Sequence, residues 1–389
     1  MAFNNVDLYL SRPRNIMRFF GVWLPPKNYV KSNIIYMLIV MMTQYSFVLF
    51  EFIYISDVWG DLDEVSEASY LLFTQASVCY KSTVFLINKN KLMSLLEMME
   101  LEIFAPQNSE HQKLLREQSQ KIKHLCMFFL TSAITTCTLW AMIPLFDDAG
   151  SRSFPFKIWM PIDPQRSPHY EIGYVYQMIT IYISAFLFIG VDSTTLSMIM
   201  FGCAQLEIIM EKVRQVHPMP NSNLKPNERK QLIEERSTLF IECIKHHQEV
   251  VKYIEKVEDT YHANIFFQLS GTVGIVCIIG FRISIVDRSS VQFYSMVNYM
   301  VTMLSQLFLY CWCGNELTIR SQKLREVLYQ TPWYELDVKF GRLLWVAMQR
   351  MKRPIIFKAG HYIALSRPTF VSILRSSYSY FAVLNQANK

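Results

Sequence analysis

Long apolar runs recur seven times along the chain, and this recurrence restricts the fold more than any other feature. The runs occupy residues 34–55, 68–86, 125–145, 173–206, 263–281, 291–313 and 363–385. A helix needs about 20 apolar residues to cross the hydrocarbon core of a bilayer. Charged residues make up 18% of the 389 residues, against about 25% in soluble proteins. A large soluble helical core does not require such runs, so the pattern predicts an all-α membrane protein with seven transmembrane helices.

The distribution of Lys and Arg predicts how these helices are oriented. Thirty of the 38 Lys and Arg lie before the first run or between runs two and three, four and five, or six and seven, with Arg367 counted there. Six lie in the segments on the opposite side. Because positively charged loops remain in the cytoplasm, we expect a cytoplasmic N-terminus and an extracellular C-terminus. A G-protein-coupled receptor, the alternative seven-helix class, has the reverse orientation.

The ends of the runs divide the chain into segments. We predict a cytoplasmic N-terminal segment (1–33), spans one to four (34–206) with an extracellular loop (146–171), a cytoplasmic helical extension (207–262), spans five and six (263–313), cytoplasmic anchor helices (314–362) and the last span (363–389). The fourth run is longer than a bilayer requires, so its helix should tilt or continue into water.

The predicted cytoplasmic segments contain helical patterns of their own. Apolar residues at helical spacing predict a helix over 227–261 that continues into span five, and amphipathic helices over 316–329 and 338–351. Together they favour a cytoplasmic helical bundle. The Pro- and Asn-rich stretch 218–226 is predicted to be disordered. The proline-rich extracellular segment 147–168 is predicted to be an ordered lid or a turn-rich cap.

Signals for catalysis and for metal binding are missing from the sequence. There is no Walker, Gly-x-Ser-x-Gly or His-Glu-x-x-His motif. His246 and His247 are adjacent, so they point about 100° apart on a helix and cannot chelate one metal ion; we predict a solvated helix face. We expect no enzyme activity, no cofactor and no nucleic-acid partner, because the basic runs suit anionic membrane lipid. Asp192, in the middle of span four, either bonds a neighbouring Ser or Thr or couples conformational states.

The spans contain aromatic and hydroxyl side chains that are candidates for ligand binding. All lie in the outer half of spans two to six under the predicted orientation. They are Tyr70, Phe73, Thr74, Ala133, Thr136, Trp140, Tyr182, Phe186, Phe293, Tyr294 and Val297. A cavity with such a lining would suit a small volatile or lipophilic ligand. For each of these residues, ordinary packing between helices is the alternative.

A polar stripe distinguishes the last span. Residues 366–368, Ser-Arg-Pro, predict the start of a helix with Pro in its first turn. The stripe combines Ser372, Arg375 or Ser376, Ser379, Val383 and Gln386 at helical spacing. A polar stripe on a membrane helix faces water or protein. In a symmetric assembly it would line a conduit, with Val383 as an apolar gate; the alternative is packing against other spans of the same chain.

The end of this span resembles a known family. The run SSYSYFAVLNQ at 376–386, with Ser379-Tyr380 and Gln386, closely resembles the C-terminus of insect odorant receptors. Gustatory receptors have a Phe after the Gln, where this chain has Ala387. Pro-Trp-Tyr around Trp333 and the Lys-Arg-Pro at 352–354 are similar to the same family. Span count and inverted topology agree with it over the whole chain.

This resemblance implies a ligand-gated, non-selective cation channel built as a tetramer around the last spans. An odorant-specific subunit of this kind pairs with an olfactory co-receptor in a heterotetramer, in the plasma membrane of olfactory sensory neurons. The chain lacks the co-receptor's longer intracellular segment, so it resembles a tuning subunit. The residues carried over to the pore are Ser379, Tyr380, Val383 and Gln386. Arg375 departs from a cation pore, so either it faces away or one such subunit is present in each channel.

Overall fold

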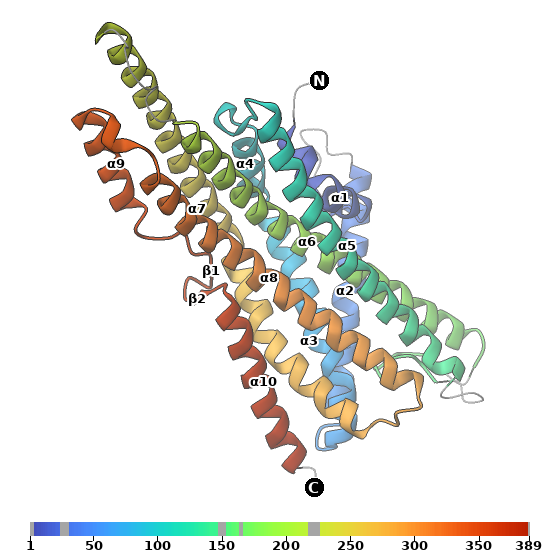
Figure 1. The fold of residues 1–389 in the computed structure, drawn as a ribbon. Coiled ribbons are helices and arrows are strands. Elements are labelled where there is room, and N and C mark those ends of the chain that lie inside the picture. The colour runs from blue at the N-terminus through green and yellow to red at the C-terminus, as the bar shows by residue number, and fades with distance from the viewer. Residues whose placement is uncertain (1–3, 24–30, 147–152, 163–165, 217–225, 388–389) are drawn as a thin grey trace.

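The computed structural model describes residues 4–23, 31–146, 153–162, 166–216 and 226–387 and is almost entirely helical there (Figure 1). The long helices are α2 (Lys31–Asp57), α3 (Leu62–Ile87), α5 (Ser109–Phe146), α6 (His169–Arg214), α7 (Pro226–Ile285), α8 (Val291–Tyr329) and α10 (Arg367–Ala387). Shorter elements are α1 (Asn5–Phe19), α4 (Lys89–Met99), α9 (Val338–Arg350), the 3₁₀ turns η1 (Glu102–Phe104) and η2 (Trp333–Glu335), and the strands β1 (Lys358–Ala359) and β2 (Ile363–Ala364).

Six of the seven predicted runs lie wholly inside one long helix each. The seventh, residues 363–385, begins four residues before α10, because β2 occupies residues 363–364. Within the described part of the chain, four helices are long and apolar enough to span a bilayer by length and composition alone: Ser32–Asp57, Ser109–Phe146, His169–Arg214 and Pro226–Ile285. The other three, α3, α8 and α10, carry polar residues such as Lys81, Gln306 and Arg375. Polar side chains in membrane helices face protein or water instead of lipid. Lys81 and Gln306 are buried against protein, whereas Arg375 of α10 is exposed in the single chain.

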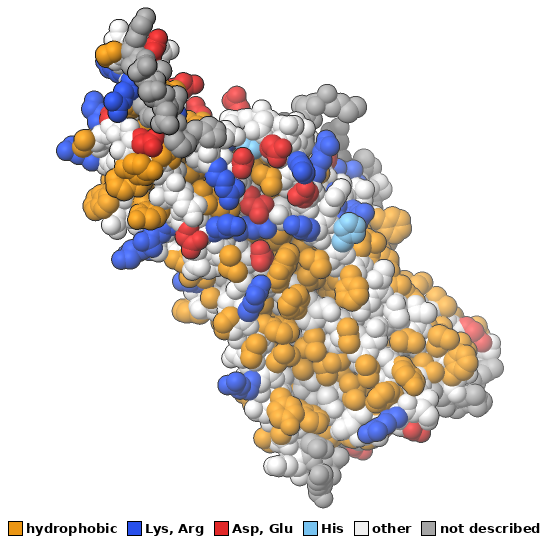
Figure 2. Space-filling model, viewed as in Figure 1, with side chains coloured by type: hydrophobic (Ala, Val, Ile, Leu, Met, Phe, Trp, Pro, Cys, Tyr) orange, Lys and Arg blue, Asp and Glu red, His pale blue; other side chains and the backbone are white. Residues whose placement is uncertain are grey.

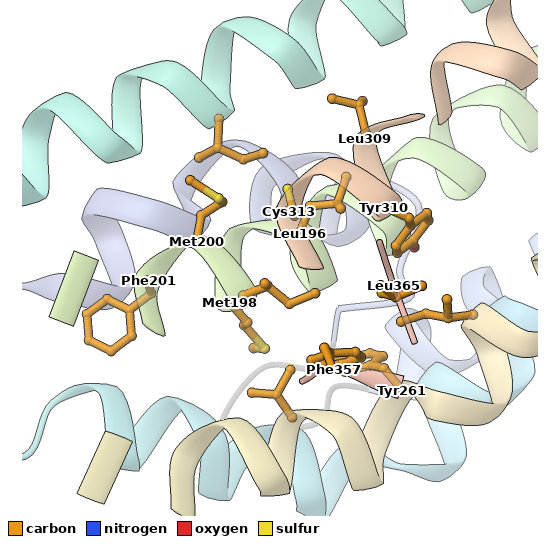
Figure 3. Packing of buried hydrophobic residues seen from close by; sticks show 14 of the residues in the cluster. Leu196, Met198, Met200, Phe201, Tyr261, Leu309, Tyr310, Cys313, Phe357 and Leu365 are labelled. Atoms are coloured by element: carbon orange, nitrogen blue, oxygen red, sulfur yellow. The ribbon is translucent and has the colours of Figure 1, made fainter. Parts of the chain in front are cut away.

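Helix α6 occupies the centre of the bundle. It contacts α1, α5, α7 and α8, and its side chains from Leu187 to Leu206 are all buried. Leu196, Met198, Met200 and Phe201 lie in the cluster of Figure 3, beside residues of neighbouring helices. The predicted continuation of this helix beyond residue 206 is confirmed. The continuation does not enter water, however, because α1, α5 and α7 accompany it and bury its sides.

The cytoplasmic helices predicted from periodicity are present with one change. The helix over 227–261 and span five form one 60-residue helix, α7, as predicted. The segment 316–329 is not a separate helix but the end of the 39-residue α8. Helix α9 matches the prediction, and the Asp337 carboxylate caps it by accepting a hydrogen bond from the Phe340 N–H at 2.8 Å. Residues 217–225, which include most of the stretch predicted to be disordered, lie outside the described residues.

The predicted solvated face at His246 and His247 is wrong. His246 is 1% exposed and its Nε2 lies 3.0 Å from the amide oxygen of Gln205 on α6. Burial is the main cause that lowers the pKa of His246 to about 3 and that of His247 to about 4. Both imidazoles are therefore neutral at physiological pH. Their burial could not be predicted from the charged residues around them, because it results from contact with α6. One side of α7 packs against α6 well beyond the apolar run.

Helix α1 was not anticipated in the mixed N-terminal segment. Its Tyr9 and Met17 are fully buried, and Met17 fits against Gly190 of α6, where a Cβ atom would lie 2.5 Å from the Met17 sulfur. The Asn5 amide donates to the Met99 carbonyl at 2.9 Å. The segment 1–33 therefore begins with a helix that is part of the core.

Charge separates the two ends of the bundle. In Figure 2 Lys, Arg, Asp and Glu gather over the end that carries α4 and α9, whereas orange hydrophobic side chains dominate the other part. The C-terminus lies at the end opposite to α1 (Figure 1), as an odd number of passes requires. Which end of the bundle faces the cytoplasm stays a prediction.

Candidate ligand-binding site

Helices α3, α5, α6 and α8 surround a small buried cavity in the half of the bundle nearer to the α5–α6 connection. Its volume is about 50 Å³ and its lining is almost wholly apolar. The lining residues are Leu71, Thr74, Gln75, Val78, Ala133, Thr136, Cys137, Trp140, Ile181, Ser184, Ala185, Phe188, Tyr299, Thr302 and Met303. A dry apolar cavity of about 150 Å³ binds benzene. This cavity therefore has to widen before it can accept a ligand with one ring.

Trp140 of α5 forms an aromatic wall of the cavity. It is 4% exposed, and its ring centroid lies 5.1 Å from that of Tyr299 and 5.2 Å from that of Phe156, both in edge-to-face geometry. Tyr70 packs against both Trp140 and Tyr299. Among the described residues, the buried indole Nε1 of Trp140 has no hydrogen-bond partner. A buried donor without a partner costs free energy, so a ligand with an acceptor oxygen would remove that cost.

Hydroxyl and amide groups of α3 and α6 also line the cavity. The Ser184 Oγ lies 2.7 Å from the Gln75 amide oxygen of α3 and hydrogen-bonds Gln44 of α2. These contacts join three helices at the cavity surface. On the α5–α8 side, the Asn298 amide donates to the Thr136 Oγ1 at 2.8 Å. The polar groups are paired within the protein, so they set the positions of the lining helices.

A second cavity of about 370 Å³ lies beside the first and shares Leu71 with it. Its lining includes Tyr70, Phe156 and the carboxyl group of Glu51. Both carboxyl oxygens of Glu51 are buried and lack a hydrogen-bond partner among the described residues. Its walls include residues 153–158 of the α5–α6 connection, and its Tyr70 and Phe156 pack on Trp140, so we call this cavity the vestibule.

The described part of the predicted lid, residues 153–162, is held in place over the vestibule. The Gln177 amide of α6 accepts from the Phe156 N–H at 3.1 Å and donates to the Phe156 carbonyl at 3.2 Å. Lys157 lies 2.9 Å from Glu64 and from Glu67 of α3. The described residues therefore agree with an ordered lid; residues 147–152 and 163–165 are outside the description.

The eleven residues proposed from the sequence fall into three groups. Thr74, Ala133, Thr136 and Trp140 line the cavity, and Tyr70 lies directly behind Trp140. Tyr182 and Phe186 line a separate shallow groove on the outside of α6 together with Phe20. Phe293 packs on Tyr294, which is 59% exposed, and Phe73 and Val297 are also exposed.

Helix rotation explains which lining residues the sequence missed. On α6 the cavity uses Ile181, Ser184 and Phe188, whose face is turned by more than about 100° around the helix from the face of Tyr182 and Phe186. On α8 it uses Tyr299 and residues 302–303, one to two turns further along than the proposed 293–297. On α3 the remaining lining residues, Leu71, Gln75 and Val78, share a helix face with Thr74, so helical spacing from Thr74 would have predicted them.

A buried ion pair lies directly beside the cavity. Lys81 Nζ of α3 lies 2.7 Å from Asp192 of α6 and 4.0 Å from the ring centroid of Phe188, which lines the cavity. The Tyr310 hydroxyl donates to Asp192 at 2.7 Å, and the Gln306 amide donates to its other oxygen. Asp192 thus bonds Lys81, Gln306 and Tyr310 instead of the neighbouring Ser or Thr that the sequence suggested. Both charges are paired, as burial requires.

Helix α10 presents the polar stripe on its outer side. Ser379, Tyr380 and Gln386 are exposed, and Val383 is 64% exposed. Arg375 is exposed as well, whereas Ser377, on another face, is 1% exposed. The helix packs on α7 and α8 with that other face. Within one chain, the stripe is therefore left largely exposed.

Comparison with known proteins identifies relatives over nearly the whole length. Odorant receptor Or1 of Anopheles gambiae is 23% identical over 389 residues, which covers 95% of this chain and 93% of that protein. Odorant receptor 46a, isoform A, of Drosophila melanogaster is 24% identical over 345 residues, covering 87% and 88%. The family resemblance seen at the last span is thus supported along the chain.

Solved structures and a family model agree with this result. The insect olfactory receptor OR5 from Machilis hrabei, solved in complex with eugenol, has the same fold with a TM-score of 0.85 at 15% identity, covering 99% of this chain and all of that one. The model of the 7tm Odorant receptor family matches residues 61–378, and the seven long helices are its membrane spans. The chain therefore belongs to the odorant receptor family of multi-pass membrane receptors, which are not enzymes.

Proposed function

We propose that the chain is the odorant-specific subunit of a ligand-gated, non-selective cation channel. A small volatile or lipophilic ligand binds between α3, α5, α6 and α8, and the channel opens a pore lined by α10. The observation that carries this proposal is the buried apolar cavity with the unpartnered Trp140 N–H in its aromatic wall. The complex of a receptor of the same fold with eugenol, a small aromatic compound, supports this ligand class.

The chemistry of the cavity restricts the ligand further. Its lining is apolar apart from hydroxyls and amides that are already bonded within the protein. The Trp140 Nε1 is the buried donor left for the ligand among the described lining residues. A ligand with one acceptor oxygen and an otherwise apolar body satisfies that donor without leaving its own polar atoms unpaired. It enters through the vestibule and widens the cavity.

The pore is formed when the outer faces of α10 meet in a tetramer. Ser379, Tyr380, Val383 and Gln386 face away from the rest of the chain, and a polar stripe of this kind is unfavourable toward lipid. Val383 supplies an apolar gate and Gln386 a polar collar. Arg375 shares the exposed side, so four such subunits would place four arginines around one conduit. This charge favours a heterotetramer in which olfactory co-receptor subunits supply most of the pore.

A chain of polar contacts links the cavity wall to α7, which packs on the pore helix. Ser77 of α3 donates to Gln268 of α7 at 2.8 Å, and the Gln268 amide donates to Gln306 of α8 at 2.8 Å. Gln306 in turn bonds Asp192 beside the cavity wall. Helix α7 also packs on α10, where Phe381 lies against Gly280. Widening of the cavity displaces α3 and α6 at this network and so shifts α7 against α10.

The proposed orientation puts the N-terminus in the cytoplasm of an olfactory sensory neuron. The Lys and Arg bias supports it, and the charged end of the bundle then forms the anchor between subunits. A G-protein-coupled receptor needs the N-terminus outside. Labelling an N-terminal epitope on intact cells distinguishes the two orientations, since surface labelling contradicts the channel proposal.

The decisive experiment measures current. The chain is expressed with and without the olfactory co-receptor, and whole-cell current is recorded across a panel of small oxygen-containing volatiles and their hydrocarbon analogues. We expect cation current with the co-receptor only, with the oxygenated member of each pair more potent. Secondary transport predicts saturable uptake without ligand-evoked current. Absence of current for every ligand, despite surface expression of both subunits, would contradict the channel proposal.

A further inference from the structure

Two imidazoles and two carboxylates meet where α7 contacts the β-hairpin that leads into α10. One ligand atom from each of Asp259, His262 and His361 lies within 4.8 Å of the others. The rings of His262 and His361 are 3.8 Å apart between centroids. None of these residues belongs to the ligand cavity or to the polar stripe of α10, so the cluster has no role in the function proposed above.

The hairpin carries His361 in a fixed position. Strand β1 pairs with β2 in antiparallel register, and the turn between them contains Gly360 and His361, both with positive φ. The Gly360 N–H donates to the His262 carbonyl at 3.0 Å. Phe357 and Leu365, which flank the hairpin, are buried with Tyr261 of α7 in the cluster of Figure 3. The backbone therefore brings His361 to His262, while its exposed side chain can still rotate.

We propose that Asp259, His262 and His361 form a binding site for a divalent transition metal ion, with Zn²⁺ as the preferred ion. Two imidazoles and one carboxylate are a set that Zn²⁺ accepts, with water in the fourth position. Zinc bonds of about 2.0–2.1 Å place tetrahedral ligands roughly 3.3 Å apart. The ligand atoms lie within 4.8 Å of one another, and rotation of the exposed His361 and Asp259 side chains can bring them to that spacing.

One ring nitrogen of the cluster is free to bind a metal ion. The buried Nδ1 of His262 has no hydrogen-bond partner among the described residues. In the tautomer that carries its proton on Nε2, this Nδ1 offers a lone pair to a metal ion. Glu258 lies 3.7 Å from the His361 Nδ1, which positions a carboxylate to orient that ring while its other nitrogen binds metal.

One cation competes for the site. Lys91 of α4 lies 3.2 Å from the Asp259 carboxylate, and both side chains are exposed. Such an exposed pair is weak, so Zn²⁺ displaces Lys91 from Asp259. The bound ion then links α7 directly to the segment that begins α10. It follows, resting on the proposed channel function, that zinc resists movement of the hairpin and reduces the ligand-evoked current.

Direct metal binding tests the site. Purified full-length protein is titrated with Co²⁺, whose visible absorption reports tetrahedral coordination, and Zn²⁺ affinity is measured by competition with a fluorescent chelator. We expect one tight ion per chain in wild type. His262→Gln and His361→Asn should bind at least about tenfold more weakly; Asn is chosen because it tolerates the positive φ at position 361. His124→Ala removes an exposed histidine of α5 and should leave binding unchanged.

Two further variants are expected to bind zinc more tightly, a result that loss of protein stability could not produce. Asp259→His supplies a third imidazole and Lys91→Met removes the competing cation, so both should tighten Zn²⁺ binding. Equal affinity in wild type, His262→Gln and His361→Asn would overturn the site. In excised patches, buffered cytoplasmic Zn²⁺ should reduce current in wild type and not in His361→Asn. If the protein binds zinc but no variant gives a current, the channel function is contradicted and the metal site is retained. If the protein gives a current but wild type and the histidine variants bind zinc equally well, the metal site is contradicted and the channel function is retained.

Discussion

Helices α6 and α10 both contain hydroxyl side chains among apolar residues, but their surroundings differ. On α6 Thr194 bonds the Gly190 carbonyl at 2.8 Å and is fully buried. On α10 Ser379 bonds the Arg375 carbonyl at 3.0 Å in the same way and is exposed. The two hydroxyls make equivalent bonds to their own helices, so their different exposure depends on the neighbouring helices. From Leu187 to Leu206 helix α6 has partners on every side in one chain, whereas α10 has them on one side.

This difference separates the two proposed tasks of the molecule. The cavity at α6 is complete in a single chain, with its lining, its polar contacts and its lid. The stripe of α10 is complete only when other subunits cover or extend it. Substitutions near α6 should therefore affect folding and ligand choice, and substitutions on the α10 stripe should affect the assembled pore. The following four predictions test that division, from the largest expected effect to the smallest.

The largest effect is expected at the buried pair of Lys81 and Asp192. Lys81→Met leaves the Asp192 charge buried and without its ion pair, which should destabilise the protein by about 3–5 kcal/mol. Thermal melting of the solubilised protein, followed by size-exclusion fluorescence, measures this. The double variant Lys81→Met/Asp192→Leu removes both charges and should regain most of the loss. A single variant that melts like wild type would show that the pair does not hold α3 to α6.

A large effect on ligand response is expected at Trp140. Trp140→Ala removes the aromatic wall and should shift ligand potency by about tenfold or more without abolishing assembly, since truncating one buried aromatic anchor costs about 2 kcal/mol or more. Trp140→Phe keeps a ring but removes the N–H, so it should weaken oxygenated ligands more than hydrocarbon analogues. Concentration–response curves measure both. An equal loss for the two ligand classes would contradict the role of the N–H.

An intermediate effect is expected at the gate. Val383→Ala reduces the apolar ring of the proposed pore, so it should raise the current without ligand and leave the rank order of ligands unchanged. Val371→Ala is the matched control, because Val371 is also an exposed valine on α10 but is not part of the stripe. An equal current without ligand in the two variants would contradict the proposal that the stripe lines the pore.

The smallest effect near neutral pH is expected from the buried histidines. The unfolded chain protonates His246 with a pKa near 6.5, whereas burial lowers the folded pKa to about 3. The unfolded state thus binds more protons between these values, so stability is complete above pH 6.5 and falls as the pH drops toward 3. Melting temperatures measured from pH 7.5 to 4.5 should fall less for His246→Gln. A decline equal to that of wild type would assign the effect to other groups.

Much of the fold followed from local patterns. Run length predicted all seven long helices, and periodicity predicted the uninterrupted extension of α7 below its apolar run. Ser366 and Pro368 predicted the start of α10, although β2 occupies residues 363–364, where the last span was expected to begin. The prediction failed at α1 and at His246, because contacts with other helices bury segments whose own composition is mixed or charged.

The sequence by itself determined the number of apolar helices, their charge asymmetry and the polar face of α10, since each depends on residues that are close along the chain. The tertiary structure alone decided which face of each helix meets the cavity. It also placed Lys81 against Asp192 and His361 against His262, pairs separated by 111 and 99 positions. The physical reason is that helix periodicity sets the angle between side chains of one helix but not its rotation against the next. That rotation is set by packing, as Gly190 against Met17 illustrates.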